Sequence, residues 1–267
     1  MNFAEKYGPW AVIAGASEGT GRAFAHKIAS QGVQCVLIAR REGPLTKVAD
    51  ELRAEYGTEC ITVSVDLYAT DAFDHIRSAV GSREVGLFIS NAGGDPHSSR
   101  FLDLDVDDWI NQIKRNIINV VCCCHHFGGH MRERKRGGIL LVGSGSCYGG
   151  ASFMAIYSGT KAFDLSFGEG LWAELHGHGV DVLNLILGRT DTPALREVLA
   201  LKNLPVPPDL ASPEDVAEVG LERLPYGPMH NWGQTEDETG FSPVSAAARR
   251  ARIRAVDAST RDVFGGD

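Results

Sequence analysis

Tyr157 and Lys161 stand four residues apart in a segment with helical periodicity. On an α-helix, residues at i and i+4 share one face, so the phenol and the ammonium are expected to lie together. A nearby ammonium stabilises the phenolate, which makes a tyrosine usable as a general acid and base near neutral pH. Ser144 precedes the tyrosine by 157 − 144 = 13 residues and ends an expected strand. There its hydroxyl can hydrogen-bond a substrate oxygen on which charge develops.

A glycine-rich segment, 15–21, lies between the first expected strand and the first expected helix. Glycines at such a turn let the backbone approach a pyrophosphate, which rests on the helix N-terminus. The segment therefore predicts a dinucleotide site, and an ordinary strand-to-helix turn is the alternative. The residues expected to bind the phosphates are Gly15, Ser17, Gly19 and Gly21.

The end of the second expected strand indicates the type of dinucleotide. A carboxylate there binds the ribose hydroxyls of NAD, whereas a basic residue accommodates the 2′-phosphate of NADP. Here the strand is followed by Arg40 and Arg41, with no carboxylate before Glu42. We predict NADP(H), with Arg40 as the main phosphate partner and Arg41 and Ser17 as helpers; NAD is the less favoured alternative. Two solvated surface arginines are the other interpretation.

Polar and small residues follow three further elements. Asp66, after the third strand, is predicted to bind an adenine amino group or else to cap a turn. Asn91, Ala92 and Gly93 follow the fourth strand, where small residues allow the backbone to lie close to a cofactor. Asn116 is a polar residue among aliphatic ones within a long expected helix, which makes it a candidate site residue.

Short apolar strands alternate with helical segments along most of the chain. Strands that are apolar on both faces, alternating with helices, indicate a parallel sheet covered on both sides. The expected strands are 10–14, 34–39, 60–65, 87–90, 139–142 and 182–187, with 228–232 as a weaker candidate. The expected helices are 22–30, 45–56, 72–80, 106–132, 157–176 and 193–203, with another starting at Ser212.

The chain is predicted to form one domain over residues 1–267, because no composition shift marks a boundary before about residue 190. Residues 193–210 are predicted to form a substrate lid. A C-terminal extension is expected from about residue 233. The basic segment 246–254 within it is expected to be a solvated helix face, with a partner or membrane-surface contact as the alternative.

Composition limits the classes of function. The chain has 267 residues with 26 Lys+Arg and 34 Asp+Glu, giving a net charge of −8, which argues against a nucleic-acid partner. Neither a secretory signal nor a membrane-spanning stretch is visible. The six cysteines form no CxxC pair, and the adjacent His125 and His126 would point to different helix faces, so no metal site is predicted. Reduced cysteines in a cytoplasmic protein are the expectation.

Together, the glycine segment, Asn91-Ala92-Gly93, Asn116, Ser144, Tyr157 and Lys161 resemble the short-chain dehydrogenase/reductase superfamily, over roughly residues 8–225. The resemblance implies a single Rossmann-type α/β domain: a doubly wound parallel sheet of about seven strands in three α/β/α layers. It implies that Tyr157 exchanges the substrate proton and that Lys161 holds the nicotinamide ribose and assists the tyrosine. Ser144 would orient the substrate oxygen, and Asn116 would support a water in the proton relay.

Further expectations rest on the same resemblance. The segment 188–192 matches the family's loop after the sixth strand, which adds Gly188, Thr190 and Thr192 as cofactor contacts. Ala14 replaces the family's usual threonine, so a hydroxyl link towards Asn91 is expected to be lost. Homodimers or homotetramers, formed through the helices that hold Asn116 and Tyr157, are implied.

Within the superfamily, residues 7–12 and 143–146 are similar to the branch of hydroxysteroid dehydrogenases and very-long-chain 3-oxoacyl reductases. That similarity implies hydride transfer between a nicotinamide and a bulky, apolar carbonyl or secondary alcohol. Two other functions stay open at this point: a non-catalytic NADP(H)-binding sensor or scaffold on the same fold, and a sugar-nucleotide epimerase or dehydratase.

Overall fold

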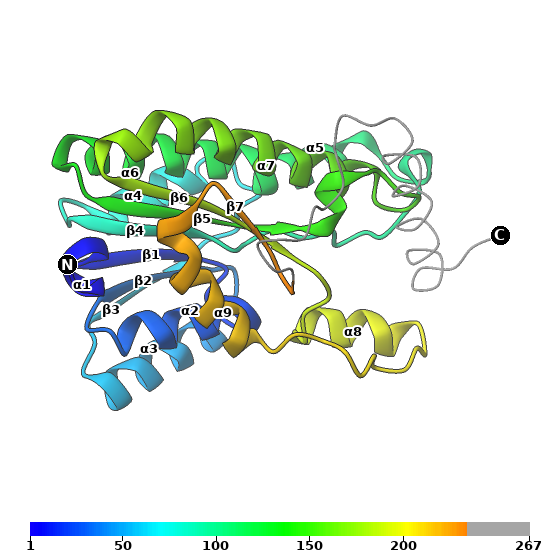
Figure 1. Cartoon of the computed structure of the whole chain (residues 1–267). Helices are drawn as coiled ribbons and strands as arrows, with labels where there is room; N and C mark the ends of the chain where they lie inside the picture. The colour runs from blue at the N-terminus through cyan, green and yellow to red at the C-terminus, as the bar shows by residue number, and fades with distance from the viewer. Residues whose placement is uncertain (234–267) are drawn as a thin grey trace.

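A seven-stranded, all-parallel sheet forms the centre of the protein, in a computed structural model that describes residues 1–233 (Figure 1). The strand order is β3-β2-β1-β4-β5-β6-β7, which is the Rossmann-type arrangement expected from the sequence. The strands are β1 (Trp10–Ala14), β2 (Gln34–Ala39), β3 (Cys60–Ser64), β4 (Val85–Ser90), β5 (Gly137–Ser144), β6 (Val180–Leu187) and β7 (Met229–Asn231).

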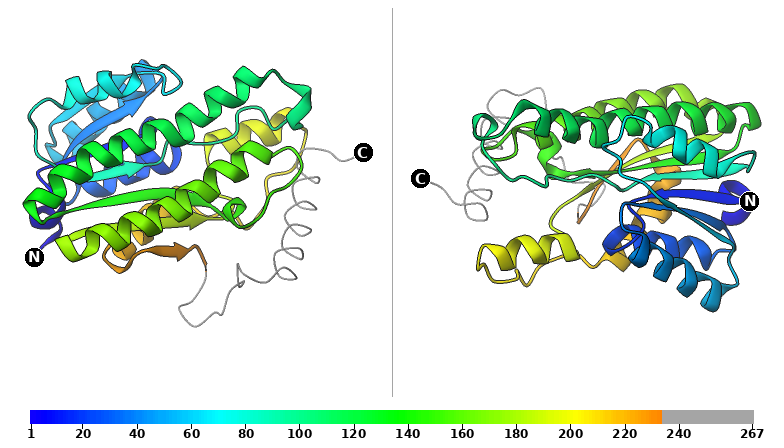
Figure 2. Two further views of the ribbon diagram at one scale, coloured as in Figure 1. Left: turned by 90° about the horizontal axis from the view of Figure 1, so that it is seen from above. Right: turned by 180° about the vertical axis from the view of Figure 1, so that it is seen from behind.

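Helices cover both faces of the sheet and give three layers (Figures 1 and 2). One face carries α2 (Gly19–Ala29), α3 (Glu42–Tyr56) and α9 (Pro213–Arg223), and the other carries α4 (Ala72–Val80), α5 (Val106–Ile113), α6 (Asn119–Arg134) and α7 (Ala155–Leu175). The short helix α1 (Phe3–Tyr7) lies at the amino end of the strands, and α8 (Pro193–Leu201) stands away from the body near their carboxyl ends.

Alternation along each strand divides the core into two clusters. In β1, Ala11 and Ile13 pack with α2, α3 and α9, whereas Trp10, Val12 and Ala14 pack with α4 and α6. The inner strands β1, β2, β4, β5 and β6 are therefore buried on both faces, which is why they appear in the sequence as continuous apolar runs. The edge strands β3 and β7 are only partly buried.

The expected elements agree with the structure, with one informative exception. The weak candidate at 228–232 is indeed the last strand, paired in parallel with β6. The long helix expected over 106–132 is not one continuous α-helix, because a π-helical turn, Lys114–Ile118, separates α5 from α6. The expected C-terminal extension and its basic segment 246–254 lie outside the described residues.

The strand order reverses between β1 and β4, which pair with each other in parallel. At such a reversal the loops that leave the two strands diverge to opposite faces of the sheet, and ligands of open α/β sheets bind there. The segments after β1, β4 and β6 hold most of the predicted cofactor-binding residues, and Ser144 ends β5.

Candidate active site

The glycine loop after β1 needs glycine at two positions. Gly15 adopts a φ of +77°, a conformation that favours glycine. A Cβ on Gly21 would lie 2.0 Å from the Gly15 carbonyl oxygen and 2.6 Å from Nδ2 of Asn91, so helix α2 can begin here only without a side chain. The Asn91 amide donates to the Gly15 carbonyl at 3.1 Å, which joins the loops after β1 and β4. This bond supplies a link towards Asn91 that needs no hydroxyl at Ala14.

The two arginines after β2 lie in different electrostatic settings. Arg41 forms an ion pair with Glu18 of the glycine loop, with 2.6 Å between Nη2 and Oε2. Arg40 is exposed, and none of residues 1–233 provides it with an ion-pair partner. Ser17 is half-buried in the loop that Glu18 belongs to. Arg40 is therefore the guanidinium that is available to an added phosphate.

The loops after β3 and β4 supply small and polar groups. Asp66 accepts a hydrogen bond from the Tyr68 backbone at 3.0 Å, so its carboxylate does cap a turn, while its second oxygen is not used in that bond. A Cβ on Gly93 would lie 3.2 Å from the Lys161 ammonium and 3.6 Å from Oδ1 of Asn116. Gly93 thus brings the β4 loop against the predicted catalytic helix.

Ser144 ends β5 and begins a 3₁₀ turn. Its Oγ accepts hydrogen bonds from the Ser146 backbone at 3.3 Å and from the Ser146 hydroxyl at 3.1 Å. Because both contacts use the Ser144 oxygen as acceptor, its own proton remains available for another oxygen.

Lys161 lies on the same helix as Tyr157 and is 5% exposed, whereas Tyr157 is half-buried. The ammonium donates to the Val142 carbonyl at 2.9 Å and to the Asp164 carboxylate at 3.0 Å. Burial opposes the charged amine, but Asp164 and Tyr157 outweigh it, so the pKa of Lys161 lies above its ordinary value. Asp164 was not predicted; its position three residues after Lys161, on one helix face, was the available signal.

Asn116 lies within the π-helical turn and connects three elements. Its amide donates to the Gly94 carbonyl at 3.2 Å and to Oγ1 of Thr160 at 3.1 Å. Its oxygen accepts from Nε of Arg115 at 3.1 Å, a contact that the sequence did not suggest. π-helical turns are frequent at functional sites, and here the turn directs a buried amide at the predicted catalytic helix and the β4 loop.

The loop after β6 meets the glycine loop. A Cβ on Gly19 would lie 3.2 Å from Cγ2 of Thr192, so these two predicted cofactor contacts are neighbours. The Thr192 hydroxyl caps α8 by accepting from the Leu195 backbone at 3.2 Å. Gly188 is exposed, and Oγ1 of Thr190 is buried without a hydrogen-bond partner among residues 1–233.

These features fit an extended dinucleotide. The glycine cradle, formed by Gly15 and Gly21, has no room for a Cβ on Gly21. Arg40 is exposed after β2, and the 188–192 loop meets the glycine loop where Thr192 lies near Gly19. The orphaned Thr190 hydroxyl is a group that still needs a partner. The predicted cofactor residues therefore lie around one region of the sheet, with Lys161 beside it.

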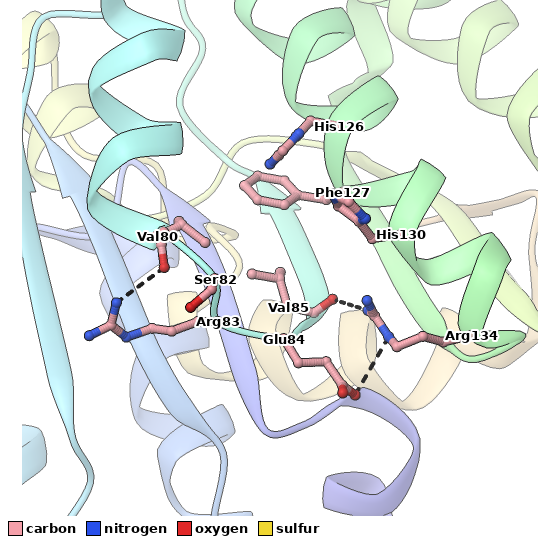
Figure 3. Close-up of a pocket in the computed structure, with 10 residues that line it drawn as sticks. Val80, Ser82, Arg83, Glu84, Val85, His126, Phe127, His130 and Arg134 are labelled. Atoms are coloured by element: carbon pink, nitrogen blue, oxygen red, sulfur yellow. Dashed lines mark hydrogen bonds and ion pairs between the residues drawn. The ribbon is translucent and has the colours of Figure 1, made fainter.

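A separate pocket lies at the opposite end of the sheet (Figure 3). It has a volume of about 320 Å³, and it is lined by the end of α4, the start of β4 and the α6 residues His126, His130 and Arg134. Arg134 points across it to the Val85 carbonyl and towards Glu84.

Within the described part of the chain, no group of three His, Cys, Asp or Glu side chains could hold a metal ion. No described helix is long and apolar enough to cross a bilayer.

The fold and the site together define a dinucleotide-binding α/β oxidoreductase. Residues 9–202 match the family described as short chain dehydrogenase, and the chain belongs to that family of NAD(P)-dependent enzymes, which act on carbonyl and alcohol groups. The resemblance seen in the sequence is confirmed, including its branch.

Individual relatives support the same assignment. A 7beta-hydroxysteroid dehydrogenase of Clostridium sardiniense is 32% identical over 228 residues, covering 84% of this chain and 85% of that protein. The very-long-chain 3-oxoacyl-CoA reductase of Homo sapiens is 33% identical over 183 residues, covering 67% of this chain but only 58% of the reductase. A solved 7beta-hydroxysteroid dehydrogenase structure superposes with a TM-score of 0.86 at 29% identity, covering 96% of this chain and 99% of the other.

Proposed function

We propose that the protein is an NADP(H)-dependent oxidoreductase that interconverts a bulky, apolar ketone and its secondary alcohol. The observation that carries the proposal is the position of Lys161, which lies on the same helix as Tyr157. Its ammonium donates to the Val142 carbonyl, two residues before Ser144, and lies against Gly93 of the loop after β4. This arrangement supports the prediction that a proton donor and a hydroxyl lie next to the predicted cofactor site.

In the proposed mechanism, Ser144 donates its free proton as a hydrogen bond to the substrate oxygen and orients it. Tyr157 gives its phenolic proton to that oxygen during reduction and takes it back during alcohol oxidation. The Lys161 ammonium, whose pKa is raised, stabilises the phenolate that is left. Asn116 holds the Thr160 hydroxyl and the Gly94 carbonyl in place behind the lysine. A nicotinamide dinucleotide, when bound by the glycine loop and the 188–192 loop, supplies or accepts the hydride.

The preference for NADP(H) over NAD is supported by charge. Arg40 is exposed and unpaired within residues 1–233, at the end of β2, where a 2′-phosphate is recognised in this kind of fold. Arg41 is occupied by Glu18, so it can add less.

A bulky, apolar substrate is supported by the hydroxysteroid dehydrogenase relatives and by the surroundings of the site. Tyr148, Phe153 and Met154 lie between Ser144 and Tyr157 in the chain, where a substrate would pass. Helix α8, within the predicted lid 193–210, exposes 78% of Leu201. An exposed leucine on a helix that stands away from the body suits a lid that closes over an apolar substrate (Figure 2).

A substrate panel tests the proposal. Steroid ketones, aryl ketones, 3-oxoacyl thioesters and sugar-derived ketones are each incubated with NADPH or NADH, and cofactor absorbance is followed. We expect the highest kcat/KM with a steroid or aryl ketone and NADPH. Turnover confined to sugar-derived ketones would overturn the substrate class, and a preference for NADH would overturn the cofactor assignment.

We also propose that the protein is a homodimer or homotetramer and that it is cytoplasmic. The half-exposed Ile118, in the π-helical turn between α5 and α6, is an apolar group that a second subunit could cover. All six cysteines are free thiols, which supports the proposal of a reducing compartment. Light scattering after gel filtration tests the first proposal, which a monomeric mass would contradict. Cell fractionation tests the second.

A further inference from the structure

A buried ion pair lies directly behind the predicted proton donor. Oδ2 of Asp164 is 3.0 Å from Nζ of Lys161, and both side chains are almost completely buried. The ammonium has three N–H donors, of which one binds Asp164 and one binds the Val142 carbonyl. The third is left for the side where Gly93 and the predicted cofactor lie.

The charges around this pair make Asp164 the counterion of the lysine. Arg115, from the π-helical turn, disfavours a second positive charge here, and Tyr157 on α7 supports the ammonium. On the other side, Cys124 of α6 faces Asp164 with a fully buried thiol whose pKa is raised by burial, so it remains neutral. Without Asp164, a buried ammonium beside Arg115 would lack a carboxylate partner.

The ion pair does not stabilise the charged forms of Lys161 and Asp164 equally. The pKa of Lys161 is raised, as expected for a paired amine, yet the pKa of Asp164 is also raised, because burial outweighs the attraction of the ammonium. The geometry explains this difference: Oδ1 of Asp164 is buried without a hydrogen-bond partner among the described residues, so only half of the carboxylate is satisfied. A half-satisfied carboxylate is costly for stability and therefore calls for a reason in function.

We propose that Asp164 is a positioning residue, which holds the Lys161 ammonium charged and directed so that it can serve Tyr157 and the bound cofactor. The inference deepens the proposed function, because it rests on Lys161 assisting that reaction. Asp164 itself contacts neither substrate nor cofactor. It acts only through the lysine, with Val142 as the second fixed point.

A thermodynamic cycle tests the pairing without any activity. The melting temperature is measured for the wild type, Asp164→Asn, Lys161→Met and the double variant. We expect Asp164→Asn to lower the melting temperature clearly in the lysine background and to have little effect, or to raise it, in the Lys161→Met background. The proposal is also supported if a protein with Asp164→Asn melts cooperatively only when it carries Lys161→Met as well. Equal losses in both backgrounds would overturn it, because Asp164 would then act through other neighbours.

NADPH binding, followed by cofactor fluorescence between pH 7 and pH 11, tests the positioning role. In Asp164→Asn we expect the NADPH Kd to rise at least about fivefold at pH 8, and the alkaline loss of affinity to begin about one pH unit lower than in the wild type. Asp164→Glu keeps the charge and should restore the wild-type pH dependence. Cys124→Ala, which changes the packing on the other side of Asp164, should melt earlier but keep that dependence.

An Asp164→Asn enzyme with wild-type affinity and pH dependence would refute the positioning role. Failure of the wild type to bind NADPH would instead refute the proposed function, and the melting cycle would still decide whether Asp164 serves Lys161.

Discussion

At the scale of single residues, the site is built from groups whose hydrogen-bonding capacity is only partly used inside the protein. Ser144 accepts two hydrogen bonds and keeps its proton, and the Lys161 ammonium keeps one donor. Thr190 has a buried hydroxyl without a partner in residues 1–233. Buried polar groups are normally satisfied, so the unused capacity of these three residues supports the proposal that ligands complete the network here.

Tyr157→Phe removes the hydroxyl of the proposed proton donor and keeps the aromatic ring. We expect kcat to fall by about 100- to 10,000-fold, the range typical for loss of general acid–base catalysis, while the Kd for NADPH stays within about threefold. Steady-state kinetics and fluorescence titration measure the two quantities. A variant that retains most of the wild-type kcat would show that another group transfers the proton.

Arg40→Ala and Arg41→Ala form a matched pair for cofactor choice. A charge-assisted hydrogen bond contributes about 1.5–3 kcal/mol, so Arg40→Ala should raise the KM for NADPH by roughly ten- to a hundredfold and leave the KM for NADH almost unchanged. Arg41→Ala should have a smaller effect on NADPH, because its guanidinium already pairs with Glu18. A larger effect from Arg41 than from Arg40 would exchange their roles.

At the scale of elements, the site depends on close approaches between loops that leave different strands. The β1 and β4 loops are joined by the Asn91–Gly15 hydrogen bond, and the β6 loop touches the glycine loop through Thr192 and Gly19. Each approach needs a small residue or a specific amide at one position. Binding of a long, flexible cofactor thus requires several loops to be fixed relative to one another before it arrives.

Gly21→Ala tests this requirement. Its Cβ would meet the Gly15 carbonyl oxygen at 2.0 Å, so the loop must move. We expect a loss of about 1–3 kcal/mol in stability and at least a tenfold weaker affinity for NADPH. Gly170→Ala on α7 is the control, since its added Cβ meets nothing within 4 Å. That control should be stabilised slightly, because alanine suits a helix interior better than glycine. Equal NADPH affinity in both variants would argue against the cradle.

Much of this arrangement is predictable from sequence because it follows local rules. Buried parallel strands produce apolar runs such as 34–39, and a tyrosine and lysine at i and i+4 must share a helix face. The π-helical turn at Asn116 was missed, because one extra residue in a turn leaves no distinct composition. Arg115 and Asp164 were missed because each acts through a partner brought close only by the folded chain.

At the scale of the whole molecule, the two ends of the sheet have different roles. The carboxyl ends carry loops with unsatisfied groups and the projecting helix α8. At the amino ends, beside the pocket around Arg134, helix α1 packs on the sheet: its Tyr7 is 3% exposed and lies close to Gly138 of β5. Arg136 reaches the Glu5 carbonyl at 2.6 Å, which ties α1 to the segment just before β5. The packing of α1 at the amino ends therefore serves stability, whereas the loops at the carboxyl ends are the proposed place of the chemistry.

Tyr7→Phe tests how much the packing of α1 on the sheet contributes to stability. The Tyr7 hydroxyl donates to the Asp181 carboxylate of β6 at 2.5 Å, a bond to a charged group whose loss should cost about 1.5–3 kcal/mol at pH 7. Burial first, and then Asp181, raises the pKa of Tyr7 above its ordinary value. A raised pKa in the folded state means that this stabilisation is complete below pH of about 10, where unfolded tyrosine ionises, and is lost as the pH rises further.

Thermal melts of the wild type and Tyr7→Phe at several pH values from 7 to 11 measure both effects. The wild type should melt higher at pH 7, and its advantage should shrink above pH of about 10 by up to about 1.4 kcal/mol for each pH unit. Lys161, whose pKa is also raised, adds an alkaline loss of its own, but it is present in both proteins and cancels in the comparison. The substitution lies at the amino ends of the strands, so the Kd for NADPH at pH 7 should stay within about twofold. A constant difference in melting temperature across the whole pH range would show that the pKa of Tyr7 is not raised in the folded protein.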